Sequence, residues 1–257
     1  MRVFILILMI VGGAAFSDNL YGQLITMDYM KVLPENEQDY LEVERTWKKA
    51  HQERLKVGLI KGWYLYKVRY AGTESPYQYV TINVYNTFDD SENEFFEGVF
   101  DKALKGINID TLNKKTMKAR DLTRTEVFVW VDGLERKYDN PAKFMYVNYI
   151  DVKQGEETNY LDIERYVWKP IHAELQQTSQ MASWGLWEIW FYSHTKYNYI
   201  TLNEFYEYKD IDSYNYSDVF QKVHQGKDLT AFMRNTADAR KSDKTELWEL
   251  IDFVGKK

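Results

Sequence analysis

The chain has 257 residues, 45% of them hydrophobic and 28% charged, a composition that fits one large or two ordinary globular domains and excludes a disordered chain. Its net charge of -6, without any basic block, argues against a nucleic-acid partner, because proteins that bind a phosphate backbone concentrate Lys and Arg on one face. There is no cysteine, so disulfides and cysteine nucleophiles are excluded, and stability must come from packing.

Residues 1–22 have the pattern of a secretory signal peptide. Arg2 precedes an apolar run over residues 3–11, and small residues follow at 12–15. The run is too short to cross a bilayer, which takes about 20 apolar residues, although a retained N-terminal anchor is the alternative. Cleavage is expected after Gly22, or else after Ala15. We therefore expect an exported protein, periplasmic or secreted, with no membrane span after cleavage.

The rest of the sequence is an internal duplication. Residues 40–51 (YLEVERTWKKAH) return at 160–172 as YLDIERYVWKPIH, and the offset of 120 residues also pairs segments further along the chain. Two repeats of this length indicate a duplicated domain, whereas solenoids stack shorter units. We therefore expect a first repeat over residues 23–138, a linker at 139–142 and a second repeat over residues 143–257.

Repeat one begins with a strand-like run at residues 24–32. A helix is predicted over 36–57, because Tyr40, Val43, Trp47 and Ala50 recur at helical spacing. Strands are expected at 62–70 and 77–86, helical segments at 95–104 and 110–120, and a last strand at 125–132. This order, β-α-β-β-α-β, is that of a ferredoxin-like domain.

Repeat two has the same order. Strands are expected near residues 143–152, 183–191, 197–205 and 245–254, with helices at 158–178 and 210–240, the latter broken near Gly226. One extra residue near Val167, with Pro170 close by, predicts a π-bulge in the first helix of this repeat. Such bulges are frequent at functional sites, which favours repeat two as the working half; a harmless kink is the alternative.

The second strand of each repeat is apolar on both faces. In repeat two, Trp184 and Leu186 share one face, and Trp187 and Ile189 share the other. Helices cover only one side of such a sheet, so we expect the other repeat to cover the second side. The predicted fold class is α+β, with two tandem ferredoxin-like repeats.

Each unit has the motif Y-L-[ED]-[VI]-E-R, followed by a strand that begins near a Trp (GWYLYKV or WGLWEIW). Two such units in tandem resemble the dimeric α/β-barrel superfamily. The resemblance implies two sheets that face each other in one intramolecular barrel, and therefore a monomer with an internal pseudo-dimer, or a homodimer of such chains. Members of that superfamily include antibiotic-biosynthesis-type monooxygenases, haem-degrading enzymes, chlorite-dismutase-like haem proteins and proteins of no known activity. No catalytic motif of these members is present, so the resemblance implies no catalytic residue.

The two histidines at one helix position are the first site candidates. His51 and His172 are equivalent, and Glu44 and Glu164 precede them by two turns on the same side of the helix. A carboxylate beside an imidazole suits a general base or an axial metal ligand. One His per repeat is too few for a metal-ion cluster, but haem needs only one protein ligand. The alternatives are a His that hydrogen-bonds at the helix–sheet edge, and surface ion pairs of the two Glu with Lys48 and Lys169.

Polar and aromatic residues repeated on the strands complete the candidate site. The third strands carry Tyr79, Thr81 and Asn83 on one face, and Tyr199, Thr201 and Asn203 at the equivalent positions, while Trp63 and Trp184 lead the second strands. This semi-polar face is expected either to line a pocket or the barrel interior, or to form a hydrogen-bonded layer between the sheets. A salt bridge is also expected between Arg120 and Glu126, and between Arg240 and Glu246.

The sequence contains no Gly-rich phosphate loop, no G-x-S-x-G and no H-E-x-x-H, so hydrolase and nucleotide-dependent activities have no support. We expect a protein that binds a small hydrophobic or aromatic ligand, with haem as a candidate cofactor, between helix and sheet. The alternative is a non-catalytic structural or interaction module of the cell envelope, whose aromatic residues are all core and interface.

Overall fold

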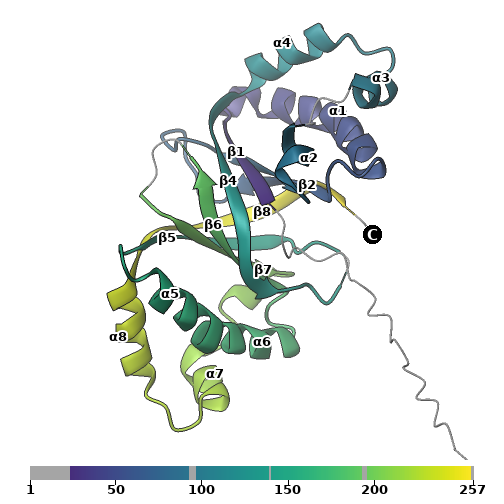
Figure 1. The fold of residues 1–257 in the computed structure, drawn as a ribbon. Helices are drawn as coiled ribbons and strands as arrows, with labels where there is room; N and C mark the ends of the chain where they lie inside the picture. The colour runs from purple at the N-terminus through teal and green to yellow at the C-terminus, as the bar shows by residue number, and fades with distance from the viewer. Residues whose placement is uncertain (1–23, 93–96, 139, 193–195, 256–257) are drawn as a thin grey trace, which may run out of the picture.

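Eight antiparallel strands close into one barrel in the computed structural model, which describes residues 24–92, 97–138, 140–192 and 196–255 (Figure 1). The strand order around the barrel is β1-β3-β2-β8-β5-β7-β6-β4. The predicted signal peptide lies outside the described residues. Within the described ranges, no helix is both long and apolar enough to cross a membrane.

Repeat one supplies four strands and the helices on their outer side. The strands are β1 (Leu24–Lys31), β2 (Gly62–Val68), β3 (Tyr79–Tyr85) and β4 (Asp121–Leu134). After a 3-10 turn (Pro34–Asn36), α1 (Glu37–Lys56) links the first two strands, and α2 (Phe88–Glu92), α3 (Glu97–Ala103) and α4 (Ile109–Ala119) link the last two.

Repeat two follows the same plan. Its strands are β5 (Phe144–Val152), β6 (Ser183–Phe191), β7 (Tyr199–Phe205) and β8 (Arg240–Gly255). Between β5 and β6 lie α5 (Glu157–Ile163), a π-helical turn (Glu164–Trp168) and α6 (Lys169–Gln177). A 3-10 turn (Tyr208–Ile211), α7 (Tyr216–Val223) and α8 (Leu229–Ala239) precede β8.

The two sheets close on each other through the last strand of each repeat. Within the repeats the order is β4-β1-β3-β2 and β8-β5-β7-β6, and β4 then pairs with β6 while β8 pairs with β2. Closure leaves no unpaired sheet edge. The predicted fold, two tandem ferredoxin-like repeats in one intramolecular α/β barrel, is therefore confirmed.

Strand alternation separates an inner core from two outer ones. On β3, Val80, Ile82 and Val84 point into the barrel, where they pack with residues of both repeats such as Tyr29 and Trp248. The side chains between them point outward to the helices, where Tyr79 and Tyr85 belong to the core under α1 and α4. The semi-polar face that the sequence predicted therefore faces the helix layer, and the interior of the barrel is mainly apolar.

The interior of the barrel holds a hydrogen-bonded network around Glu126 and Glu246. The sequence predicted other partners, Arg120 and Arg240, for these two carboxylates. Glu126 is fully buried and pairs with Arg124 at 2.9 Å, and Glu246 pairs with Lys244 at 2.9 Å. The expected salt bridges from Arg120 and Arg240 do not form, because Glu126 and Glu246 point into the barrel while both arginines lie on the helix side. Arg240 instead approaches Glu164, at 3.8 Å.

The helix of repeat two absorbs its extra residue as predicted. The π-helical turn at Glu164–Trp168 contains Val167, and Pro170 lies in the first turn of the following α6. The carbonyl oxygen of Val167 accepts a hydrogen bond from Nε2 of His224, at 3.0 Å. A side chain of α7's C-terminal cap therefore satisfies a backbone group that the irregular turn leaves available.

Candidate functional site

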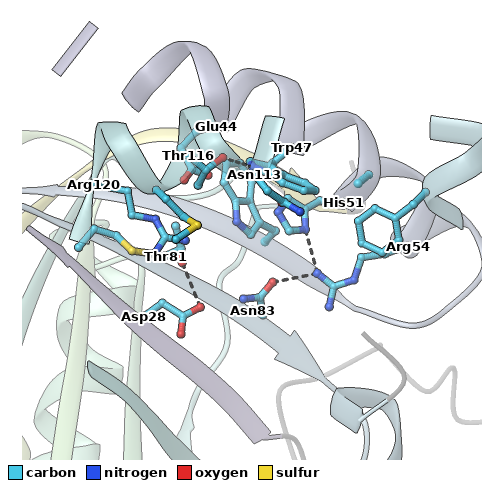
Figure 2. Close-up of a pocket in the computed structure, with 15 residues that line it drawn as sticks. Asp28, Glu44, Trp47, His51, Arg54, Thr81, Asn83, Asn113, Thr116 and Arg120 are labelled. Carbon is cyan, nitrogen blue, oxygen red and sulfur yellow. Dashed lines mark hydrogen bonds between the residues drawn. The ribbon is translucent and has the colours of Figure 1, made fainter. Parts of the chain in front are cut away.

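A cavity of about 370 Å³ opens between the helices and the outer face of the sheet in repeat one. Strands β1, β2 and β3 form its floor, and helices α1, α3 and α4 form its walls (Figure 2). The outward-pointing positions of β3 place Thr81 and Asn83 on the floor, and the face of α1 that carries Glu44, Trp47 and His51 lies above them.

Flat aromatic rings line much of the cavity. The imidazole of His51 stacks on the indole of Trp63, with ring centroids 4.8 Å apart and planes within 12°. Trp47 packs edge-on against Phe100 at 6.1 Å, and its Nε1 donates to the Thr116 hydroxyl at 2.9 Å. These rings are held by neighbours on three elements, so they present preformed faces to a ligand.

At one end of the cavity, Arg54 organises a polar network. It is 1% exposed, and its Nη1 donates to Nδ1 of His51 at 2.9 Å and to Oδ1 of Asn83 at 3.3 Å, while Nη2 donates to the Tyr85 hydroxyl at 3.2 Å. Burial and the charge of Arg54 lower the pKa of His51 to about 3, so this histidine is neutral at pH 7. Because Nδ1 accepts a hydrogen bond, the ring proton is on Nε2.

At the other end of the cavity lie the buried carboxyl group of Glu44, the half-buried carboxyl group of Asp28 and a second arginine, Arg120. Burial raises the pKa of Glu44 to about 7, against the opposing effect of Arg120. Burial also raises the pKa of Asp28, although its carboxylate accepts hydrogen bonds from Thr125 at 2.5 Å and Thr81 at 3.5 Å. Glu44 therefore exchanges a proton near neutral pH, which is a property of general acids and bases.

Four of the predicted candidates in repeat one meet in this cavity: His51, Glu44, Trp63 and Asn83. Tyr79 does not line it, because its ring packs on Tyr40 at 4.9 Å and its hydroxyl donates to Glu37.

The equivalent candidates in repeat two lie in a packed core. The ring of His172 stacks on Trp184 at 5.3 Å, and burial lowers the pKa of His172 to about 3. Asn203 donates to the carbonyl of Tyr146 at 3.3 Å, Tyr199 packs on Tyr160 at 5.2 Å, and burial raises the pKa of Glu164 to about 7.

Larger side chains explain this packing. Ile171 stands where repeat one has Ala50, and Tyr146 stands where it has Thr26. Ile171 is fully buried in the repeat-two core, and Tyr146 packs against that core. The sequence favoured repeat two as the working half, but the cavity that the structure describes lies in repeat one.

The surface ion pairs expected within α1 and its counterpart are wrong. Lys48 pairs with Asp252 at 2.5 Å, and Lys169 pairs with Asp132 at 2.6 Å, so each lysine reaches the last strand of the other repeat. Glu44 and Glu164 are buried instead. Likewise, the hydrogen-bond partner of His51 is Arg54, three residues along α1, and not Glu44.

Sequence reasoning missed Asp28, Arg54, Arg120 and Asn113 as cavity residues. One signal was present: Asp28, Arg54 and Asn113 are replaced by Asn148, Leu175 and Met233 in repeat two. Differences between the repeats, rather than their similarities, mark these cavity residues.

Comparison with known proteins finds similarity of fold alone. No protein-family model and no curated protein sequence matches the chain. A candidate monooxygenase of Fusobacterium nucleatum has 9% identity and a TM-score of 0.57, with 92% of this chain and 95% of that chain covered. A variant of chlorite dismutase from Candidatus Nitrospira defluvii has 10% identity and a TM-score of 0.51, covering 90% and 92%. A haem-binding protein of Thermus thermophilus has 7% identity and a TM-score of 0.50, also covering 90% and 92%.

The chain has the fold of the dimeric α/β-barrel proteins, built here as a tandem repeat. Because many activities share this fold, function has to be argued from the site itself. The cavity of repeat one is lined by flat aromatic rings, a neutral histidine, two carboxyl groups and two arginines. This combination can hold a planar molecule and can exchange a proton with it.

Proposed function

We propose that the chain is an exported protein that binds a small, mainly aromatic ligand in the cavity of repeat one. The observation that carries the proposal is the cavity itself. Its volume of about 370 Å³ lies within the range of small-molecule sites, which runs from roughly 300 to 1,000 Å³. Such sites are mostly apolar, with a few convergent polar groups that fix the ligand's orientation.

The contrast between the repeats supports a role in binding. Both repeats bury a Trp-stacked histidine and a glutamate of raised pKa, and in repeat one a cavity opens beside them, where Ala50 stands in place of Ile171. An empty space costs packing energy, because its lining loses contacts that a filled core would make. A structural or interaction module alone would gain nothing from that cost.

Filling the cavity provides a direct test. In Ala50→Ile, position 50 receives the residue that repeat two carries as Ile171, so the fold has already accommodated this side chain once. Lys49→Ile is the matched control, because it places the same side chain on an exposed neighbouring position of α1. We expect saturable binding of naphthol by calorimetry in the wild type and in the control, and its loss in Ala50→Ile. Equal binding by all three proteins would contradict the proposal.

Haem is the second candidate, and it is supported by the haem-binding protein of Thermus thermophilus, which has a similar fold. The residues of the cavity fit it poorly. A histidine that ligates a metal commonly donates its other ring N–H to an acceptor, whereas Nδ1 of His51 accepts from Arg54, which leaves the proton on Nε2. We therefore derive no chemistry through haem. A hemin titration that gives a Soret band lost in His51→Ala, but kept in His172→Ala, would instead establish haem at this site.

Export is proposed from the pattern of residues 1–22. Expression of the full chain followed by cell fractionation and mass spectrometry tests it. We expect a product in the exported fraction that begins at Gln23. A cytosolic product that retains Met1 would refute export.

A further inference from the structure

Two cations inside the barrel allow a comparison between the repeats. Arg124 and Lys244 occupy equivalent positions, 120 residues apart. They pair at 2.9 Å with Glu126 and Glu246, and they lie 3.9 and 4.1 Å from the centroid of a buried tyrosine ring. An arginine therefore meets the structural requirement of this position. The lysine differs from it in chemistry, because an amine can lose its proton and act as a nucleophile, whereas a guanidinium stays charged.

The end of the barrel that carries Lys244 is the more open of the two. The side chain of Lys244 is 31% exposed and that of Glu246 is 18% exposed, against 19% for Arg124 and 1% for Glu126. A cavity of about 400 Å³ lies here, between the segment that joins β2 to β3 and the middle of β8. Its wall includes Tyr77 and Glu246, and Nζ of Lys244 donates to the Tyr77 hydroxyl and, at 2.9 Å, to Glu246. The amine thus lies one hydrogen bond behind the wall.

These three side chains have the properties that imine formation requires. Burial lowers the pKa of Lys244, against the opposing effect of its pairing with Glu246, so this amine loses its proton more readily than an isolated lysine. Burial and the charge of Glu246 raise the pKa of Tyr77, so its hydroxyl keeps a proton that it can donate. A lysine between a proton acceptor and a proton donor is suited to form a Schiff base with a carbonyl compound.

We propose that Lys244 forms a Schiff base with a small, uncharged aromatic aldehyde that enters this cavity. The rings of Tyr70 and Tyr146 are part of the wall and suit a flat apolar ligand. Arg69, also in the wall, pairs with Glu249 at 2.6 Å, which favours an uncharged ligand over an anion. The site is separate from the cavity of repeat one, so the inference goes beyond the proposed function and does not rest on it.

The reaction balances without a further reactant. Glu246 takes one proton from the ammonium, and the electron pair of Nζ attacks the carbonyl carbon. As the N–C bond forms, the carbonyl oxygen takes the proton of the Tyr77 hydroxyl, and a second nitrogen proton restores that hydroxyl. Glu246 then returns its proton, the C–O bond breaks and water leaves. A protonated imine with one N–H remains, and its charge is paired with the Glu246 carboxylate.

Reductive trapping on the mature chain tests the inference. The protein is incubated with benzaldehyde and cyanoborohydride, which reduces an imine to a stable amine, and labelled lysines are identified by peptide mass spectrometry. Lys209 is an internal control, because it pairs with Glu207 at 2.6 Å and its side chain is 75% exposed. We expect Lys244 to be labelled at least about tenfold faster than Lys209, as general acid–base assistance would give. The rate at Lys244 should also saturate with benzaldehyde concentration, whereas the rate at Lys209 should rise linearly.

Two variants separate this site from general lysine reactivity. Lys244→Arg copies the arginine that repeat one carries, so the fold has already accommodated this side chain, and it should lose the adduct at position 244 only. Tyr77→Phe removes the proton donor and should slow labelling of Lys244 about tenfold or more, with Lys209 unchanged. A wild-type rate at Lys244 that is no higher than at Lys209, or that does not saturate, would overturn the inference. This wild-type comparison decides the question even where Tyr77→Phe fails to fold.

Discussion

The hydroxyl of Tyr197, from repeat two, lies 2.6 and 2.7 Å from the two carboxylate oxygens of Glu126, from repeat one. The reciprocal contact joins the hydroxyl of Tyr77 to Glu246 at 2.7 Å. Each repeat thus inserts a tyrosine into the interior of the barrel to satisfy a carboxylate of the other. The two ends of the network are not equivalent, since Glu246 also accepts from Tyr149 at 3.1 Å and from Trp248 at 3.0 Å.

The first prediction follows from the difference in the number of hydrogen-bond partners between Glu126 and Glu246. Tyr197→Phe removes one of the few bonds to a fully buried carboxylate, so it should lower the free energy of unfolding by about 1–3 kcal/mol. Tyr77→Phe should cost less, because Glu246 keeps Tyr149, Trp248 and Lys244. Urea denaturation monitored by tryptophan fluorescence measures both. Equal costs would show that the additional partners of Glu246 do not share its stabilisation.

The second prediction concerns pH. Burial lowers the pKa of His51 and His172 to about 3, so the stability they contribute is present above pH 6.5 and is lost as the pH falls toward 3. Burial raises the pKa of Glu44 and Glu164 from 4.5 to about 7, so their contribution is present below pH 4.5 and is lost as the pH rises through 7. Between pH 4.5 and 6.5 the two pairs therefore oppose each other.

Replacing both glutamates by Gln should reveal the pH dependence of stability that the two histidines cause. In Glu44→Gln with Glu164→Gln, the free energy of unfolding should rise with pH between 4.5 and 6.5 more steeply than in the wild type, by up to roughly 1.4 kcal/mol per pH unit for each glutamate removed. Denaturation curves at matched pH values give the difference. Parallel pH profiles would mean that the two glutamates ionise at the same pH in the folded and unfolded chains.

The third prediction compares equivalent positions of the two repeats. Ile171→Ala removes a fully buried side chain from the filled core of repeat two and should cost about 2–5 kcal/mol. Ala50→Ile adds the same atoms to the cavity of repeat one, where there is room, and should leave stability unchanged or slightly raised. Thermal melts of the two variants test this. A loss of stability in Ala50→Ile as large as that in Ile171→Ala would contradict the space that the structure shows.

The fourth prediction concerns the π-helical turn. His224→Phe removes the donor to the carbonyl of Val167 but keeps an aromatic ring against Phe220 and Phe232, so the loss should come from the hydrogen bond alone, about 1 kcal/mol. Amide hydrogen exchange should become faster in α6, which begins directly after the turn. Unchanged exchange there would show that the turn is held by packing and not by His224.

Much of the fold could be predicted from the sequence, because the periodic patterns that specify each helix and strand are local and occur in both repeats. The recurrence of Tyr40 and Trp47 at helical spacing, and the alternation along 77–86, each specify an element, and the offset of 120 residues shows that both repeats share one plan. An extra residue near Val167 sufficed to predict the π-turn, because a helix can absorb one residue in few ways. The apolar second faces of β2 and β6 required a cover, and the other repeat provided it.

Pairings between distant residues could not be read in this way. The spacing of Glu44 and Lys48 would favour an ion pair on an isolated helix, but Lys48 pairs with Asp252 on a strand of the other repeat. Arg120 and Glu126 are close in sequence, which predicted a salt bridge. Strand alternation instead points Glu126 into the barrel. In both cases the partner is decided by which face of an element the packing buries.

By itself, then, the sequence determined two ferredoxin-like repeats and their closure, since periodicity and apolar faces act along each element and leave few ways to bury them. Only the tertiary structure decided that the cavity lies in repeat one and that Arg54 and Asp28 stand at its ends. A cavity is the space left after side chains from several elements have packed. Whether Ala50 leaves room or Ile171 fills it depends on how side chains from several elements pack together in the folded chain.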